Sequence, residues 1–321
     1  MRFAIIGAGG VGGVFGGLLA HAGHDVVFVA RGRHLQAIRD EGLRLHGPWG
    51  THVVRAGAGP DPASVADRGP FDAVLVAVKA GQVADVAASL APLVGPATVV
   101  IPLQNGVDAA STLADALGDG PVAGGLCHVF GWLEGPGEVR TTGTPLRVTM
   151  GERQGGGSPR LAQVARALRG AGVEALVVDD VEAATWEKFL FIEPFGAVGA
   201  VTRAPIGVVR SDPRSRALLV TAVGEVADVA RGRGVRIAPD AVERTVARYD
   251  ELPQDATASM QRDVVAGRPS ELREQTGAVV RAGEEARVPV PVHQFLLAAL
   301  APQEAAARSP ARAAAPPPGT R

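Results

Sequence analysis

Residues 1–30 read MRFAIIGAGGVGGVFGGLLAHAGHDVVFVA, and this stretch decides the fold. Residues 2–7 form an apolar run typical of a short buried strand, and the segment 7–12 follows directly with the pattern G-x-G-x-x-G. A helix over about 11–22 and a second strand over 25–30 complete the unit. Strand, glycine turn, helix and strand in this order predict a dinucleotide-binding unit of the Rossmann type.

The glycines of this turn have distinct physical roles in the motif. Gly7 makes the tight turn, Gly9 lets the backbone approach a pyrophosphate, and Gly12 lets the helix pack closely on the strand. The helix N-terminus attracts phosphate because its first N–H groups have no acceptor within the helix. We therefore expect the cofactor-binding turn to consist of Gly7, Gly9, Gly10 and Gly12.

The end of the second strand indicates which dinucleotide binds. An NAD site usually carries Asp or Glu there to hold the ribose hydroxyls. Here the strand runs into Arg31, and no acidic residue lies between Asp25 and Asp40. A guanidinium suits the 2′-phosphate of NADPH, so the sequence favours NADPH with Arg31 as its ligand. The alternative is that Arg31 belongs to a solvated basic turn.

The whole-chain composition excludes several classes of protein. With 321 residues, 46% of them hydrophobic, the chain is long enough for two domains with real cores. A formal net charge of −1 argues against non-specific binding to nucleic acid or to a membrane surface. One cysteine, Cys127, excludes an internal disulfide, and no His, Asp and Glu spacing is typical of a metal site. The N-terminal segment does not resemble a signal peptide, so we expect a cytoplasmic protein.

Two further strand-like runs each end on a residue type that is rare in this chain. Residues 72–78 run into Lys79, one of two lysines, and residues 98–103 run into Gln104 and Asn105, the only asparagine. Strands that alternate with helices, such as the one expected over 81–90, predict a parallel sheet with its ligand at the carboxyl ends. We therefore expect both residues to line the ligand site. The alternatives are a solvated strand end for Lys79 and an Asn-Gly turn for Asn105.

The rest of the chain divides into three parts. Residues 122–151 indicate hairpins over the sheet edge, a helix over 158–170 is capped by Ser158, and a last strand over 173–178 closes the first domain. The second domain is helical. Its expected helices are 181–201, 213–233, 239–249, 271–286 and 292–300. We predict a Rossmann-like α/β domain with a mostly parallel sheet over 1–180, an all-α domain over 181–300, and a disordered tail over 301–321.

The second lysine, Lys188, lies in an apolar helix beside Trp186 and Phe189. Burial lowers the pKa of a lysine toward the range of a general acid. The alternative is a buried stem with a solvated ammonium. Downstream, Ser270 is expected to cap a helix beginning at Glu271, whose carboxylate the helix N-terminus would stabilise.

Together these segments resemble the ketopantoate reductase (2-dehydropantoate 2-reductase) family over nearly the whole chain, up to about Leu300. The motifs that carry the resemblance are Gly7–Gly12 with the following Ala30-Arg31-Gly32, Ala77–Gln82, Gln104-Asn105-Gly106, Trp186–Phe189, Ser259-Met260 and Pro269–Leu272. The resemblance implies an NADPH-binding Rossmann domain, a helical substrate domain, and a place in pantothenate biosynthesis. It also implies a small-molecule 2-oxo acid as substrate, and it allows a homodimer.

The resemblance also implies roles for individual residues. Lys188 matches the catalytic lysine and Glu271 its partner glutamate. Asn105 and Ser259 match substrate-binding positions, while Lys79 and Arg31 match cofactor-binding positions, to which Asn105 also contributes. In this reading a positioned ammonium protonates the oxygen of a ketone as hydride reaches its carbon.

The chain departs from the family pattern on the substrate side. Typical members carry asparagines one and two helical turns after the catalytic lysine, where this chain has Ile192 and Gly196. Pro194, which lies between them, is expected to kink the helix. The family also favours asparagine where this chain has Thr276. The pocket wall is therefore expected to be less polar.

Three functions follow as hypotheses. The first is NADPH-dependent reduction of a 2-oxo acid, with ketopantoate (2-dehydropantoate) as default substrate. The second is reduction of a different, more apolar ketone by an enzyme of the same fold. The third is a non-catalytic NADP(H) sensor, against which the retained Lys188 and Glu271 argue.

Overall fold

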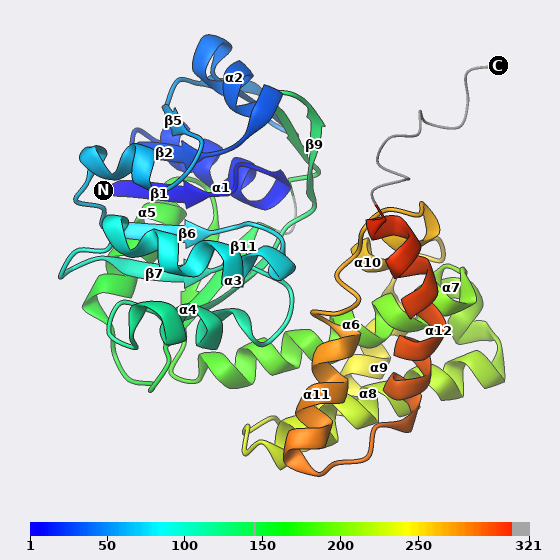
Figure 1. The fold of residues 1–321 in the computed structure, drawn as a ribbon. Helices are drawn as coiled ribbons and strands as arrows, with labels where there is room; N and C mark the ends of the chain where they lie inside the picture. The colour runs from blue at the N-terminus through cyan, green and yellow to red at the C-terminus, as the bar shows by residue number, and fades with distance from the viewer. Residues whose placement is uncertain (144–145, 310–321) are drawn as a thin grey trace, which may run out of the picture. The chain divides into compact units, whose positions relative to one another are not determined.

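The computed structural model describes residues 1–143 and 146–309 of the chain. The chain divides into two compact units, Met1–Glu182 and Ala183–Arg321. The first unit is built from strands and helices, and the described residues of the second form helices and their connections (Figure 1). This is the expected α/β domain followed by an all-α region.

The first unit is organised around a five-stranded sheet with the strand order β5-β2-β1-β6-β7. All its strand pairs are parallel. Its strands are β1 (Arg2–Ile6), β2 (Asp25–Val29), β5 (Gly57–Gly59), β6 (Ala73–Val76) and β7 (Val99–Pro102). Because the order reverses between β1 and β6, this sheet is a Rossmann-type sheet whose switch point lies at the glycine turn.

Alternate residues of these strands enter two separate cores, one on each face of the sheet. Phe3 and Ile5 belong to one core together with Phe15 of α1 (Gly10–His21). Ala4 and Ile6 belong to the other. Strands that are buried on both faces read as continuous apolar runs, which is why the sequence shows them without alternation.

The helix expected over 81–90 is instead three short pieces. They are η2 (Ala80–Gln82), α3 (Val83–Ala87) and η3 (Ala88–Leu93). Pro92 lies inside η3 and has no N–H to donate to the carbonyl four residues earlier, so the ordinary helix does not extend through this segment.

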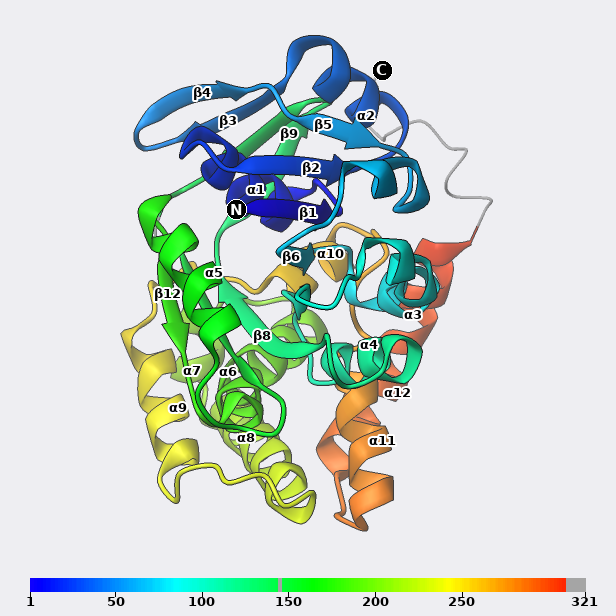
Figure 2. The same cartoon turned by 90° about the vertical axis from the view of Figure 1, so that its left-hand side faces the viewer.

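The segment after β7 and α4 (Ala109–Leu117) contributes strands to two further sheets, which also contain strands from other parts of the first unit. One has the order β4-β3-β10-β9 and the other β12-β11-β8. Figure 2 shows β3 and β4 running side by side near α2 (Gly32–Glu41). The strands are β3 (Leu43–Gly47), β4 (Gly50–Val54), β8 (Ala123–His128), β9 (Gly131–Gly135), β10 (Glu138–Thr141), β11 (Arg147–Glu152) and β12 (Glu174–Val177).

The expectation that this region covers the sheet edge is confirmed at β7, where the Cys127 thiol of β8 donates to the carbonyl of Leu103 at 3.3 Å. Val122, just before β8, forms a parallel bridge with Val100 of β7. The helix α5 (Pro159–Gly170) has the predicted cap, since the Ser158 hydroxyl accepts a hydrogen bond from the N–H of Leu161 at 3.2 Å. A short 3-10 helix, η1 (Ala63–Arg68), completes this unit.

The second unit consists of seven helices in the described part of the chain. They are α6 (Val181–Thr202), α7 (Ile206–Ser211), α8 (Pro213–Gly232), α9 (Ala241–Glu251), α10 (Ser259–Val265), α11 (Thr276–Ala286) and α12 (Pro291–Arg308). The sequence pattern does not predict α7 or α10, because each helix is too short to show a clear helical period. None of the described helices is long and apolar enough to span a membrane.

The long helix α6 continues through Pro194. A proline removes the hydrogen bond to the carbonyl four residues earlier, here that of Leu190. The hydroxyl of the buried Tyr249 donates to this carbonyl at 3.3 Å and to that of Phe191 at 2.7 Å. A hydroxyl carries a single hydrogen, so the shorter bond to Phe191 is the stronger one and the Leu190 carbonyl receives the weaker share from α9.

Two other boundaries differ from the sequence expectation. The helix expected to begin at Glu271 begins at Thr276, after a single turn. The last helix continues to Arg308, so residues 301–308 are not a disordered tail, and residues 310–321 lie outside the described part. The extension is anchored by Glu304, which is 3% exposed and accepts hydrogen bonds from the N–H and hydroxyl of Ser270.

The core of the second unit contains a buried charged cluster. His293 of α12 is fully buried, and its two ring nitrogens lie 2.7 Å from a carboxylate oxygen of Glu193 and 2.6 Å from one of Glu225. Thr276 donates to the other oxygen of Glu193 at 2.7 Å. Burial alone would lower the pKa of His293, but the two carboxylates outweigh it and raise that pKa to about 9.

This raised pKa predicts how stability depends on pH. The pKa of His293 is about 9 in the folded protein and about 6.5 when exposed. Its contribution to the free energy of unfolding is therefore complete below about pH 6.5 and is lost as pH rises through about 9. We expect urea denaturation to show falling stability between these values, and a flat profile there would contradict a charged His293.

Candidate functional site

Four sequence-predicted residues lie at one edge of the parallel sheet. Gly7 follows β1, Arg31 follows β2 by two residues, Lys79 follows β6 and Asn105 follows β7. Since these strands are parallel and adjacent, their carboxyl ends lie along the same edge. The fold therefore gathers residues separated by up to about a hundred positions at the place where such sheets bind ligands.

The glycine turn has the shape that a dinucleotide requires. Gly7 has a φ of +95°, a conformation that favours glycine. A Cβ on Gly12 would lie 2.0 Å from the carbonyl oxygen of Gly7, so only glycine allows this packing. A Cβ on Gly9 would meet nothing within 4 Å, which leaves open space beside the backbone. The turn therefore fits a pyrophosphate at the start of α1.

Gly10 is a glycine for a different reason. A Cβ there would lie 2.2 Å from the carbonyl oxygen of Gly131, the first residue of β9. The absence of a side chain lets β9 pack directly against the first residue of α1. The sequence motif does not reveal this contact because 121 residues separate the two glycines.

Arg31 is the N-cap residue of α2 and is exposed. Its backbone is extended, with φ −133° and ψ 161°, and Arg33 beside it is also exposed. Nothing in this turn is acidic, so it has no carboxylate for ribose hydroxyls. The turn presents guanidinium groups near the carboxyl end of β2.

Gln104, which the sequence identifies only as the neighbour of Asn105, links two strand ends at this edge of the sheet. The amide nitrogen of Gln104 donates to the carbonyls of Val76 at 2.9 Å and Val78 at 3.0 Å. These two bonds join the residue before Asn105 to the end of β6, immediately before Lys79. Gln104 is 7% exposed, and its carbonyl oxygen is buried without a hydrogen-bond partner. A buried polar residue at a strand end was the signal that could have identified it.

In the second unit, Lys188 lies in α6 and is 9% exposed. Its neighbours Trp186, Phe189 and Leu190 are at most 2% exposed. The expected burial of Lys188 is confirmed by this exposure. Water competes little at such a position, so the charge interacts strongly with any group brought to it.

Glu271 lies in the turn before α11 rather than in its first turn. Its carboxylate accepts a hydrogen bond from the amide of Gln275 at 3.0 Å. The next residue, Thr276, is bonded to Glu193 of α6. This contact holds the turn of Glu271 against the same helix that carries Lys188. Four residues separate Glu193 from Lys188, and four separate Thr276 from Glu271.

The two departures from the family pattern lie on α6. Ile192 is half-buried, and Gly196 is buried against α10. A Cβ on Gly196 would lie 3.0 Å from Cε and 3.5 Å from Cβ of Met260. Ser259, the first residue of α10, is thereby held near this part of α6. Met260 fills the space in which a larger side chain at position 196 would lie.

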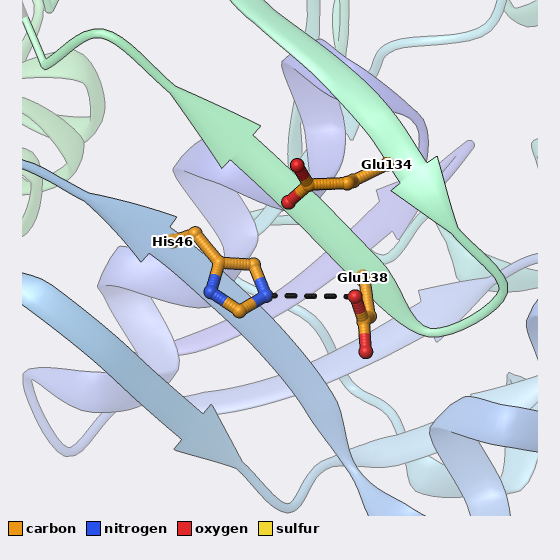
Figure 3. A group of neighbouring side chains, drawn as sticks. All are labelled: His46, Glu134 and Glu138. Carbon is orange, nitrogen blue, oxygen red and sulfur yellow. Dashed lines mark ion pairs between the residues drawn. The ribbon is translucent and has the colours of Figure 1, made fainter.

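One group of possible metal ligands occurs in the described residues. His46 of β3, Glu134 of β9 and Glu138 of β10 bring ligand atoms within 4.8 Å of one another (Figure 3). The ring Nε2 of His46 lies 3.7 Å from Glu138. Both oxygens of Glu134, however, accept from Nε of Arg140 at 2.8 and 2.7 Å. Because Arg140 already supplies the cation, we assign no metal to this cluster.

The parallel sheet, its glycine turn and the helical second unit define a dinucleotide-binding oxidoreductase of the Rossmann type. The sequence pattern of the ketopantoate reductase PanE/ApbA family matches residues 3–155, and that of its C-terminal region matches residues 180–304. The chain belongs to the ketopantoate reductase family.

Individual relatives align with this chain over nearly their full length. The chain is 28% identical to an uncharacterized oxidoreductase of Bacillus subtilis (strain 168), with 95% of this chain and 99% of that one covered. It is 30% identical to a 2-dehydropantoate 2-reductase of Mesorhizobium japonicum, with 93% and 96% covered.

Solved structures show the same fold. A PanE/ApbA family ketopantoate reductase from Ralstonia eutropha JMP134 has a TM-score of 0.87 at 31% identity, with 96% of this chain and 100% of that one covered. A D-mandelate dehydrogenase with NADH and anilino(oxo)acetate has a TM-score of 0.85 at 21% identity, with 96% and 99% covered, and shows the fold alone.

Proposed function

We propose that the protein reduces a 2-oxo acid with NADPH, and that its default substrate is 2-dehydropantoate. Family membership and the strand-end residues Arg31, Lys79 and Asn105 support this function. The observation that carries it is Lys188, a lysine with 9% exposure on a helix of apolar neighbours. Burial of an ammonium costs free energy, and buried titratable groups are concentrated at functional sites, so the position of Lys188 favours a catalytic role.

In this proposal each of these residues has a distinct role in binding or catalysis. The nicotinamide supplies the hydride when bound. Negative charge develops on the ketone oxygen, and the ammonium of Lys188 stabilises that charge and donates its proton. Glu271 orients the ammonium, while Asn105 and Ser259 hydrogen-bond the polar groups of the substrate. Lys79, Arg31 and the glycine turn bind the cofactor.

The direct test follows NADPH oxidation at 340 nm with 2-dehydropantoate and a panel of other 2-oxo acids. We expect turnover with at least one of them and, by default, with 2-dehydropantoate. No turnover with any 2-oxo acid would reject the proposal and favour a non-catalytic NADP(H)-binding protein.

A second candidate is a reductase for a more apolar ketone. The observation that favours it is Gly196, whose space is taken by Met260, together with Ile192 one turn earlier on α6. Both positions lack the polar side chains that a substrate with a hydroxyl group would bind. Turnover of an aryl or alkyl 2-oxo acid, without turnover of 2-dehydropantoate, would establish this alternative.

Arg31 provides the test of cofactor choice. We expect Arg31→Ala to weaken NADPH binding by about tenfold to a hundredfold, because it removes a charge-assisted bond to the 2′-phosphate. NADH has no such phosphate and should lose little affinity. Fluorescence titration with both cofactors measures the difference, and equal losses would show that Arg31 does not contact the phosphate.

A further inference from the structure

A histidine of α2 links three separate segments around the glycine turn. The Nε2 atom of His34 lies 2.8 Å from the carbonyl oxygen of Ala8, the residue between Gly7 and Gly9. The N–H of Gly137 donates to its Nδ1 atom at 2.9 Å. Gly137 lies between β9 and β10, so one half-buried ring connects the turn, α2 and a hairpin 103 residues away.

These two partners determine the protonation state of the ring. A carbonyl oxygen can only accept, so Nε2 carries the hydrogen, and a backbone N–H can only donate, so Nδ1 carries a lone pair. The imidazole is therefore neutral when both bonds form. Burial lowers its pKa from the usual value of 6.5, and the bond to Ala8 opposes this only in part.

The bond to Ala8 also orients the N–H of the next residue. The carbonyl of Ala8 and the N–H of Gly9 belong to one planar peptide and point in opposite directions. Holding the carbonyl toward α2 therefore directs the N–H of Gly9 away from it. The turn is open at Gly9, because a Cβ there would meet nothing within 4 Å.

We propose that His34 is a positioning residue for the dinucleotide, and that its neutral ring holds the Ala8–Gly9 peptide so that the N–H of Gly9 meets the pyrophosphate. The inference rests on the proposed cofactor binding. His34 does not touch the cofactor in this account, but acts through the backbone of the turn. The hairpin of β9 and β10 takes part because Gly137 selects the tautomer.

Protonation of His34 breaks this arrangement. A hydrogen on Nδ1 would face the N–H of Gly137, and two donors cannot bond. Cofactor affinity should therefore fall as pH falls through the lowered pKa of His34. The glycine turn and α1 have no ionisable group before His21, whereas α2 brings Arg31 and Arg33.

Two carboxylates of the hairpin lie beside basic side chains of the same sheet. Glu134 is bound by Arg140 at 2.7 Å, and Glu138 lies 3.7 Å from His46. Neither carboxylate contributes to the shift in the pKa of His34, whose causes are burial and the carbonyl of Ala8.

The test compares His34→Ala with His34→Gln. Glutamine is neutral at every relevant pH, and its amide can donate to Ala8 while its carbonyl accepts from Gly137. The probe is NADH, because the 2′-phosphate of NADPH titrates near pH 6 and would obscure the result. Its dissociation constant is measured by fluorescence titration at about pH 7.5 and about pH 5.5.

We expect His34→Ala to weaken NADH binding about tenfold at the higher pH, as the loss of two neutral bonds predicts. His34→Gln should bind nearly as tightly as the natural protein and keep its affinity at the lower pH, where the natural protein binds more weakly. The matched control His52→Gln, on β4, should keep the natural pH dependence.

Each other outcome overturns the inference. Unchanged affinity in His34→Ala, or the natural pH dependence in His34→Gln, would show that His34 does not position the turn. If His34→Ala fails to fold, the pH comparison between His34→Gln and the natural protein still tests whether His34 positions the turn. Failure of the natural protein to bind either NADH or NADPH would instead reject the proposed function, and the inference with it.

Discussion

Replacement of Lys188 by alanine is expected to lower kcat by about a hundredfold to ten-thousandfold, the usual contribution of a general acid. The side chain is 9% exposed, so bulk water is poorly placed to replace the lost proton donor. Binding of NADPH should remain, because the cofactor residues belong to the first unit. Steady-state kinetics with the best substrate of the panel, and a fluorescence titration with NADPH, measure the two effects.

A conservative replacement separates charge from proton donation. Lys188→Arg keeps the positive charge, but a guanidinium does not give up its proton near neutral pH. We expect a kcat close to that of the alanine variant. If either variant turns over at nearly the natural rate, Lys188 is not the general acid, and its burial has a structural cause.

The largest expected loss of stability comes from breaking the buried cluster of α12. His293→Leu removes the cation that Glu193 and Glu225 both contact, and Glu193 is fully buried. Removing one partner of a buried ion pair costs about 3–5 kcal/mol, because the remaining charges are neither solvated nor compensated. The free energy of unfolding from urea denaturation at pH 7 should fall by this amount.

A surface pair provides the matched control. Arg233 and Glu285 lie 2.6 Å apart with side chains 37% and 66% exposed. Glu285→Ala should cost less than about 1 kcal/mol, as exposed ion pairs do. The leucine variant should also lose the decline in stability between about pH 6.5 and 9. A loss equal to that of the surface control would show that the cluster contributes little to stability.

Much of the first unit follows from local sequence. The apolar runs before Gly7 and Lys79 and the serine before Pro159 express preferences that act within a few residues, so they predict strands and a cap correctly. Helix boundaries in the second unit depend less on the local sequence. The helix α11 begins at Thr276 rather than at Glu271, and the hydroxyl of Ser270, the expected cap, donates instead to Glu304 of α12.

The sequence by itself determined the Rossmann order, the glycine turn and the rare residues Lys79, Asn105 and Lys188 as candidates. These depend on torsional preference, apolar pattern and motif spacing, which are local properties. Only the tertiary structure decided that His34 holds the turn and that His293 joins two glutamates, since their partners lie from 26 to 103 residues away. Such bonds form between groups that burial brings together, and no spacing along the chain records which groups those are.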